Sequence, residues 1–229
     1  MRCMNFAPMS PRASAASSRS GRVASVSTRI SSPSVRVGIA VLAALGMVAL
    51  GLWPPAFLQR GLGDGTHSTL LDILVLPTEP YVLIPVIALI AGFQVLRRRW
   101  RETAFCVAAT ALPLALNTWV LKPLFGHELR GDLAYPSGHT VGLATTLIVL
   151  VFLTRQWLLA IIAAAVTAAA GIGLVGLGYH YPVDVLGGAC LAVAAVFTLS
   201  LVLRPGRARS AGSPHADTSS GNPPAASPE

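Results

Sequence analysis

The sequence has few charged residues, few cysteines and a single lysine. Charged residues make up 11% of the 229 positions, whereas 53% are hydrophobic and the mean hydropathy is +0.64. This composition is too apolar for a soluble domain of this length. Cys3, Cys106 and Cys190 are spaced neither as a disulfide framework nor as metal ligands, and the latter two are interpreted as small apolar packing residues. The chain is therefore predicted to be a polytopic membrane protein.

Apolar runs recur along the middle of the chain. Crossing a bilayer takes about 20 mostly apolar residues per helix, and no repeat at a fixed period is visible. The segment from Ser68 to Leu76 is too short to span and is predicted to be an amphipathic piece at the interface. The predicted fold class is all-α, a bundle of about six transmembrane helices. The spans are Val37 to Trp53, Tyr81 to Leu96, Thr103 to Leu121, Gly138 to Leu153, Trp157 to Leu177 and Val183 to Leu203.

The formal net charge of +8 is unevenly distributed between the two sets of span ends. Only Arg60, Lys122 and Arg130, of 17 basic residues, fall on the side that also holds His139 and His180. Short arginine-rich loops stay in the cytoplasm, so both termini are predicted to be cytoplasmic and the two histidines to face outward. The basic residues lack an aromatic-lined reading surface, which excludes nucleic acid as a predicted partner.

The two ends of the chain differ in composition from the middle. Residues 1–35 are rich in Ser, Arg and Ala and contain no acid, and residues 205–229 are rich in Ser, Pro, Ala and Gly. Both are predicted to be disordered tails, the first cytoplasmic, on either side of a membrane domain over 36–204. Two alternatives stay open for the start: an organellar transit peptide, and a cleaved signal in the first span, for which Gly51 to Pro55 is a poor cleavage site.

The string Pro136-Ser137-Gly138-His139 opens the fourth span. Pro136 cannot continue a preceding helix and Ser137 is a preferred helix N-cap, so the first turn is expected here. Unpaired N–H groups and the positive end of the helix dipole favour an anion, and Gly138 lets it approach the backbone. A phosphate is the natural occupant. Alone, the string also fits a plain turn with His139 at the interface.

His180 and Asp184 stand about one helical turn apart at the start of the sixth span. A carboxylate at this spacing can hold the proton on one imidazole nitrogen and leave the other free to attack as a nucleophile. An ionisable residue at the edge of the hydrocarbon is a functional candidate by default. The alternative is a simple interfacial hydrogen bond that steadies the helix.

Lys122, the only lysine, ends the third span and is followed by His127 and Arg130. These cations are candidates to clamp phosphate oxygens. Alternatively, Lys122 snorkels toward the interface and Arg130 pairs with Glu128 or Asp132.

Together these strings resemble the type 2 phosphatidic acid phosphatases, a superfamily shared with vanadium haloperoxidases and bacterial acid phosphatases. Its signatures are Lys-x6-Arg-Pro, Pro-Ser-Gly-His and Ser-Arg-x5-His-x3-Asp. The second is complete at Pro136 to His139, and the third survives as His180 to Asp184. The resemblance covers roughly Arg98 to Leu203, in the family's order and with its six-helix layout.

The chain departs from the family in two places. Arg130 follows Lys122 after seven residues instead of six, and His127 stands where many relatives have arginine. The Ser-Arg pair of the third signature is replaced by Gly173-Leu174, so one phosphate-binding arginine has no equivalent. Loss of one charge-assisted contact costs about 2–4 kcal/mol of transition-state stabilisation. Either another cation compensates, with Arg130 and His127 as candidates, or turnover is slow.

The resemblance implies a mechanism that needs no metal and no cofactor. His180 attacks phosphorus and forms a phosphohistidine, Asp184 orients it, and His139 protonates the leaving oxygen and later activates water. The implied phosphate-binding residues are Lys122, Arg130, His127, Ser137 and Gly138.

The expected substrate is a membrane lipid phosphate or diphosphate: phosphatidate, phosphatidylglycerol phosphate or a polyprenyl diphosphate, the last slightly favoured by an outward-facing site. The predicted location is a bacterial plasma membrane. The open alternatives are a non-catalytic or transport protein that keeps the phosphate cleft, and a metal-dependent hydrolase using His127, His139, His180 and Asp184. A haloperoxidase is disfavoured because nothing suggests a soluble vanadate cavity.

Overall fold

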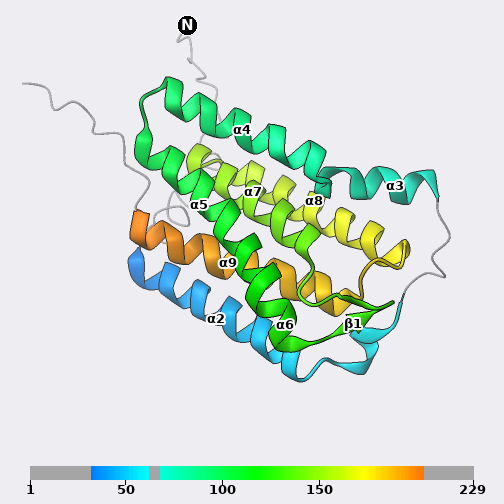
Figure 1. Cartoon of the computed structure of the whole chain (residues 1–229). Helices are drawn as coiled ribbons and strands as arrows, with labels where there is room; N and C mark the ends of the chain where they lie inside the picture. The colour runs from blue at the N-terminus through cyan, green and yellow to red at the C-terminus, as the bar shows by residue number, and fades with distance from the viewer. Residues whose placement is uncertain (1–31, 62–67, 204–229) are drawn as a thin grey trace, which may run out of the picture.

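The computed structural model describes residues 32–61 and 68–203, which form a bundle of helices with one small hairpin at its edge (Figure 1). The helices are α2 (Pro33–Leu52), α3 (Thr69–Val75), α4 (Pro80–Leu96), α5 (Trp100–Leu116), α6 (Lys122–Phe125), α7 (Gly138–Thr154), α8 (Trp157–Gly176) and α9 (Pro182–Leu203). Short 3-10 turns cover Ala56–Gln59 and Leu76–Thr78, and a π-helical segment covers Asn117–Leu121. Strands β1 (Glu128–Leu129) and β2 (Asp132–Leu133) pair antiparallel.

The predicted all-α membrane bundle is confirmed. In the described part of the chain, five helical segments are long and apolar enough to cross a membrane: Pro33–Leu52, Thr69–Leu96, Trp100–Phe125, Trp157–Gly176 and Pro182–Leu203. The remaining predicted span, the fourth along the chain, is the apolar helix α7, which has 17 residues. At 1.5 Å per residue α7 is about 25 Å long, near the lower limit for a spanning helix.

Helix starts follow from serine and proline positions in the sequence. Ser32, Ser68 and Ser137 accept backbone N–H bonds as N-caps of α2, α3 and α7, which satisfies donors that have no partner within the helix. Pro80 and Pro182 are the first residues of α4 and α9, where a missing N–H has no cost. The α2 start at Pro33 lies just inside the predicted tail 1–35. The rest of that tail, and 205–229, lie outside the described residues.

The central helix is α7, which contacts α4, α5, α8 and α9, while α2 packs along α9. Val141, Thr145 and Val149 of α7 are fully buried. From Thr140 to Thr146 every residue of the helix is buried, so its first half is surrounded by protein, which explains how a short helix is accommodated. One end of α7 carries Gly138 and His139, and the other ends at Thr154.

Two of the cysteines pack as predicted. Cys106 is buried in a cluster with Phe105, Ala109 and Val149, and Cys190 packs against the cluster that contains Met47. Both are free thiols. Cys3 lies outside the described residues.

The segment predicted to be an amphipathic helix is α3, and it docks on α8. Leu71 and Val75 of α3 pack with Leu174 of α8 in one buried cluster. Glycines make this approach possible: a Cβ on Gly173 would lie 2.8 Å from Val75 Cγ2, and one on Gly176 would lie 2.9 Å from Leu71 Cδ2. Helix α3 is therefore fixed against the bundle and not only laid at the interface.

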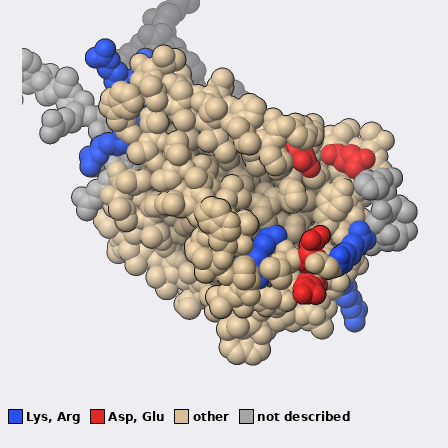
Figure 2. All heavy atoms as spheres, viewed as in Figure 1, with Lys and Arg blue, Asp and Glu red and all other residues tan. Residues whose placement is uncertain are grey.

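Arginines gather where α4 turns into α5, at the end of the bundle opposite His139 (Figures 1 and 2). Arg97, Arg98, Arg99 and Arg101 lie in this turn or beside it. Arg155, directly after α7, lies at the same end and acts electrostatically on Arg36 of α2. The uneven charge distribution read from the sequence thus corresponds to one physical end of the bundle.

Candidate active site

The N-terminal ends of α7 and α9 meet in the structure. The Ser137 N–H donates to the Asp184 carbonyl at 3.0 Å, so the two sequence strings that carry the predicted chemistry are joined by a backbone bond. Gly188 permits the approach, because a Cβ there would lie 2.7 Å from the Ser137 carbonyl oxygen. Substitution by any larger residue would push the two helix ends apart.

Tyr135 packs next to the junction between α7 and α9. Its hydroxyl donates to the Met47 carbonyl of α2, and its ring packs edge-on against Phe125 at 5.0 Å. Burial raises the pKa of the Tyr135 phenol, so the hydroxyl stays a neutral donor. A Cβ on Gly187 would clash with the same ring. Tyr135 thereby links α2, α6 and α9 directly beneath the α7 start.

A glycine-capped turn carries the chain from α8 to His180. Gly178 has a φ of 70°, and the Tyr179 and Gly178 N–H groups donate to the carbonyls of Leu174 and Val175 at 2.9 and 3.0 Å. This pair of bonds is the Schellman motif, which needs a left-handed residue that glycine adopts without strain. The turn fixes the backbone on which the His180 ring is mounted.

The His180 and Asp184 side chains lie near each other at the start of α9, but His180 Nδ1 has no hydrogen-bond partner among the described residues, so the hydrogen bond that the spacing predicted is not formed here. His180 Nδ1 lies 3.6 Å from Asp184 Oδ2, and the two side chains are 8% and 1% exposed. The same carboxylate oxygen accepts the Tyr181 N–H at 2.8 Å, which holds the carboxylate in place. Asp184 thus lies on the Nδ1 side of the imidazole and leaves Nε2 on the other side for chemistry.

The His139 ring lies next to the His180 ring. Their centroids are 5.8 Å apart with the planes at 67°. The charges that act on the His139 imidazole are those of His180, Glu79 and Lys122. The two imidazoles are therefore neighbours in an edge-to-face arrangement, so that one bound group can contact both rings.

The first turn of α7 offers donors for an anion. Ser137 Oγ accepts from the Thr140 N–H at 3.4 Å and from the Thr140 hydroxyl at 3.2 Å, as predicted for an N-cap. Within residues 32–61 and 68–203, the N–H groups of Gly138 and His139 donate to no protein acceptor. Together with the helix dipole they form an anion-binding end.

Asn117 lies against this turn. It is fully buried, and neither atom of its amide has a hydrogen-bond partner in the described chain. A Cβ on Gly138 would lie 3.5 Å from Asn117 Nδ2. An unpaired buried amide costs about 1–3 kcal/mol. A ligand at the α7 N-terminus that hydrogen-bonds to the Asn117 amide would remove this cost.

Lys122 begins α6 directly after the π-helical segment Asn117–Leu121. Its ammonium donates to the Leu133 carbonyl of β2 at 2.7 Å and is half-buried. The lysine therefore does not extend freely toward the membrane interface. Its charge acts on His139, which places it at the same end of the bundle as the two histidines.

Arg130 and His127, the two candidates to complete the clamp, lie in different environments. Arg130 is exposed at the tip of the β1–β2 hairpin with a φ of 56°, and its guanidinium has no ion pair with any residue that the structure describes. The pairing with Glu128 or Asp132 weighed from the sequence is therefore not formed. The His127 ring packs at 5.3 Å from the Tyr135 ring. No direct contact joins either residue to His139 or His180 in the described structure.

The structure explains why the third signature departs at Gly173-Leu174. The Leu174 side chain is fully buried against Val75 and Leu71 of α3, and Gly173 lies in the tight α3–α8 contact. Neither a serine nor an arginine would fit without displacing α3. Gly173 and Leu174 are part of the packing between α3 and α8. A positively charged side chain that binds phosphate therefore has to come from another part of the chain.

Among the described residues, no group of three or more His, Cys, Asp or Glu side chains is arranged to hold a metal ion. His127, His139, His180 and Asp184, the four residues of the metal-dependent alternative, do not form such a group.

Sequence reasoning missed Asn117 and Glu79. Asn117 is a lone amide inside an otherwise apolar span, five residues before Lys122, and a polar residue in a span is a functional signal. Glu79 immediately precedes Pro80 at the start of α4 and could be connected with His139 only in three dimensions.

Comparisons with known proteins identify the family and the fold. The family model of the PAP2 superfamily matches residues 48–207. Undecaprenyl-diphosphatase BcrC of Bacillus subtilis (strain 168) is 27% identical over an alignment of 162 residues, and the match covers 62% of this chain and 82% of that protein. The crystal structure of the first transmembrane PAP2 type phosphatidylglycerolphosphate phosphatase from Bacillus subtilis is similar with a TM-score of 0.52 and 21% identity, over 84% of this chain and 98% of that chain.

The close contact at Gly188 predicts that Gly188→Ala abolishes anion binding at the α7 N-terminus. The added methyl group displaces Ser137 and its neighbouring N–H donors. Inorganic phosphate should raise the melting temperature of the purified wild-type protein, since a ligand stabilises the state that binds it. No such rise is expected for Gly188→Ala. Gly38→Ala is the matched control, because a Cβ there meets nothing within 4 Å. A phosphate-dependent rise of wild-type size in Gly188→Ala would contradict this account.

Proposed function

Because the chain belongs to the PAP2 superfamily, as its sequence signatures predicted, we propose that it is an integral-membrane lipid phosphatase with a phosphohistidine intermediate and no metal requirement. The observation that carries the proposal is the cluster of the half-buried His139 with the buried His180 and Asp184, with imidazole centroids 5.8 Å apart and the carboxylate 3.6 Å from His180 Nδ1. We propose these three residues as the acid, the nucleophile and the group that orients the nucleophile.

In the proposed reaction, His180 Nε2 attacks phosphorus while the bond to the leaving oxygen breaks. Asp184 closes the 3.6 Å distance to His180 Nδ1, accepts a hydrogen bond from the Nδ1–H group, and stabilises the positive charge that develops on the ring. His139 gives its proton to the leaving oxygen, then takes a proton from the water that hydrolyses the phosphohistidine. Such acid–base participation contributes about 10²–10⁴-fold to the rate.

The phosphate oxygens are proposed to bind at the start of α7. The Gly138 and His139 N–H groups and the helix dipole stabilise negative charge, and Lys122 adds a full positive charge nearby. Ser137 fixes the turn as its N-cap, with its side chain already accepting from Thr140. Fixed donors in a water-poor site stabilise a transition state without reorganising.

We propose that Asn117 takes part of the role of the missing signature arginine. Its buried amide lies beside Gly138 with no partner in the described residues, and its N–H₂ group can donate to a phosphate oxygen. Arg130 at the hairpin tip and His127 remain proposed contributors to the clamp, each requiring a shift toward His139 when substrate binds.

The proposed substrate class is a membrane lipid phosphate or diphosphate. The site lies at the ends of apolar helices, where a lipid headgroup can reach it from the bilayer. The similarity to undecaprenyl-diphosphatase BcrC favours a polyprenyl diphosphate over phosphatidate and phosphatidylglycerol phosphate.

We propose that the site faces outward, because the arginines gather at the opposite end of the bundle and basic loops stay cytoplasmic. In intact cells, a membrane-impermeant maleimide should label the variant Tyr179→Cys. Tyr179 is next to His180 in the sequence, and its side chain is 43% exposed. Gln156→Cys, exposed at the other end, should react only after permeabilisation. The reverse pattern would place the site in the cytoplasm.

A phosphate-release panel on purified protein tests the proposed function. Wild type is expected to release phosphate fastest from polyprenyl diphosphate, compared with phosphatidate and phosphatidylglycerol phosphate. His180→Ala should fall to the level without enzyme, since no nucleophile remains, and His139→Ala should lose about 10²–10⁴-fold. Activity should survive thorough chelation. Melting temperatures of the variants confirm that each one is folded.

Three outcomes of the panel would each contradict a different part of the proposal. Equal release by wild type and His180→Ala excludes the phosphohistidine mechanism. No release from any lipid by folded wild type favours a non-catalytic or transport protein. Loss of release on chelation, restored by a divalent cation, favours a metal-dependent hydrolase.

Asn117→Ala is expected to lower kcat/KM by about 10-fold to 100-fold, the effect of losing a hydrogen bond to a charged oxygen. Asn117→Asp should be worse, because its carboxylate repels phosphate. Thr110→Ala, a buried polar position on the same helix, is the matched control and should retain activity. A packing role for Asn117 would instead show as a lowered melting temperature in Asn117→Ala with kcat/KM unchanged in the remaining folded protein.

A further inference from the structure

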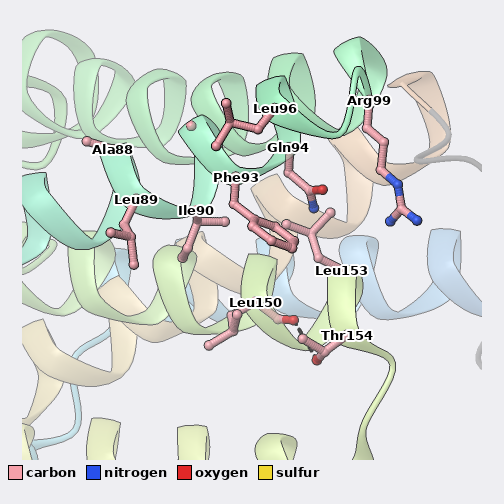
Figure 3. Close-up of a pocket in the computed structure, with 11 residues that line it drawn as sticks. Ala88, Leu89, Ile90, Phe93, Gln94, Leu96, Arg99, Leu150, Leu153 and Thr154 are labelled. Carbon is pink, nitrogen blue, oxygen red and sulfur yellow. Dashed lines mark hydrogen bonds between the residues drawn. The ribbon is translucent and has the colours of Figure 1, made fainter.

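A cavity lies between α4 and α7 at the end of the bundle opposite His180. Its volume is about 770 Å³, and its lining is mainly apolar, with Leu89 and Phe93 from α4 and Leu150 and Leu153 from α7. Figure 3 shows Phe93 and Gln94 extending from α4 toward α7, with Arg99 beside them. We call this cavity the α4–α7 groove. The proposed phosphatase reaction uses none of its residues.

Gln94 supplies an unsatisfied polar group in this groove. The residue is 5% exposed, and its Oε1 atom has no hydrogen-bond partner in the described chain. Amide groups without a partner are costly in an apolar environment, and most of the other lining residues, apart from Arg99 and Thr154, are apolar. An occupant with a hydroxyl or ammonium donor would satisfy this acceptor.

Arg99 supplies a positive charge at the end of the same groove. Its N–H is tied to the Gln94 carbonyl at 2.9 Å, so the two residues are held together by the backbone. Its side chain lines the groove, and Arg97, Arg98 and Arg101 are its neighbours. This concentration of guanidinium groups complements a phosphate.

The groove is short enough to lie within one leaflet. On α4 its lining runs from Ala88 to Leu96, where the helix ends, and eight steps at the helical rise of 1.5 Å span about 12 Å. The hydrocarbon core is about 30 Å thick, so the groove does not extend past the bilayer midplane. Acyl chains of that leaflet, and not water, surround this part of α4 and α7.

We propose that the α4–α7 groove binds one anionic phospholipid with a hydroxyl-bearing headgroup, of the phosphatidylglycerol class. An acyl chain lies along Leu89, Phe93 and Leu150, the phosphate contacts Arg99, and a headgroup hydroxyl donates to Gln94 Oε1. A phosphatidylcholine offers the same chain and phosphate but neither a net negative charge nor a donor.

Native mass spectrometry of the purified full-length protein tests this site with phosphatidylglycerol and phosphatidylcholine. Wild type should retain one phosphatidylglycerol in preference to phosphatidylcholine. Arg99→Gln should bind phosphatidylglycerol about tenfold more weakly or worse, as expected for loss of one charge-assisted contact. Gly92→Leu should also lose it, because Gly92 lines the groove and its Cβ direction is open, so the leucine fills the space.

Two matched control variants distinguish specific binding of phosphatidylglycerol in the α4–α7 groove from general electrostatic attraction of anionic lipid to the arginines. Arg101→Gln removes the same charge from the neighbouring α5 turn without touching the groove lining, and Gly38→Leu adds the same side chain at an open position of α2. Both should bind phosphatidylglycerol as wild type does. Equal weakening by Arg99→Gln and Arg101→Gln, wild-type retention in Gly92→Leu, or equal retention of both lipids by wild type would each overturn the proposal. Melting temperatures in lipid-free detergent verify that every variant is folded.

Discussion

The backbone hydrogen bond from Ser137 to the Asp184 carbonyl is the contact on which the site depends. It joins the N-terminal ends of α7 and α9, two helix ends that each carry a partial positive charge. Two such ends repel unless negative charge lies near them. The Asp184 carboxylate supplies one negative charge, and a bound phosphate would supply another. The affinity of the site for an anion therefore follows from helix packing as much as from individual side chains.

The close packing of these helices depends in turn on glycine residues at their contacts. Gly187 and Gly188 let α9 approach Tyr135 and Ser137, and Gly173 and Gly176 let α8 approach α3. In an apolar solvent, close backbone approach and buried hydrogen bonds replace the hydrophobic effect as the force between helices. The same surroundings make unpaired polar groups costly, which makes Asn117, His180 and Gln94 informative.

Most of the fold could be predicted from the sequence because each span is a separate apolar run bounded by arginine, serine or proline. Ser137 acts through local backbone chemistry, so its role as the N-cap of α7 could be predicted without a structure. The proximity of His180 and Asp184 could be predicted for the same reason, since both residues lie within one helical turn. Glu79 and His139 are sixty residues apart in sequence, and only the packing of α7 against the turn before α4 relates them.

The departures from the family could be noticed in the sequence but not interpreted there. The loss of arginine at Leu174 suggested a weakened clamp; the structure adds that α3 occupies the space. Conversely, Arg130 looked like a compensating cation because it follows Lys122 closely in sequence. Its position at the tip of a hairpin depends on the left-handed backbone at Arg130 and Gly131, which residue spacing does not reveal.

The π-helical segment gives the spacing of Asn117 and Lys122 a geometric meaning. In a regular α-helix, residues five apart point about 140° away from each other. Here the Lys122 N–H bonds to the Asn117 carbonyl, which closes a wider turn in which residues five apart lie nearly above one another. The single extra residue brings an amide and an ammonium to the same side of one helix. If this segment were a regular α-helix, one of the two side chains would point away from the other. The five-residue spacing of Asn117 and Lys122 therefore serves a common site only because the π-helical turn lies between them.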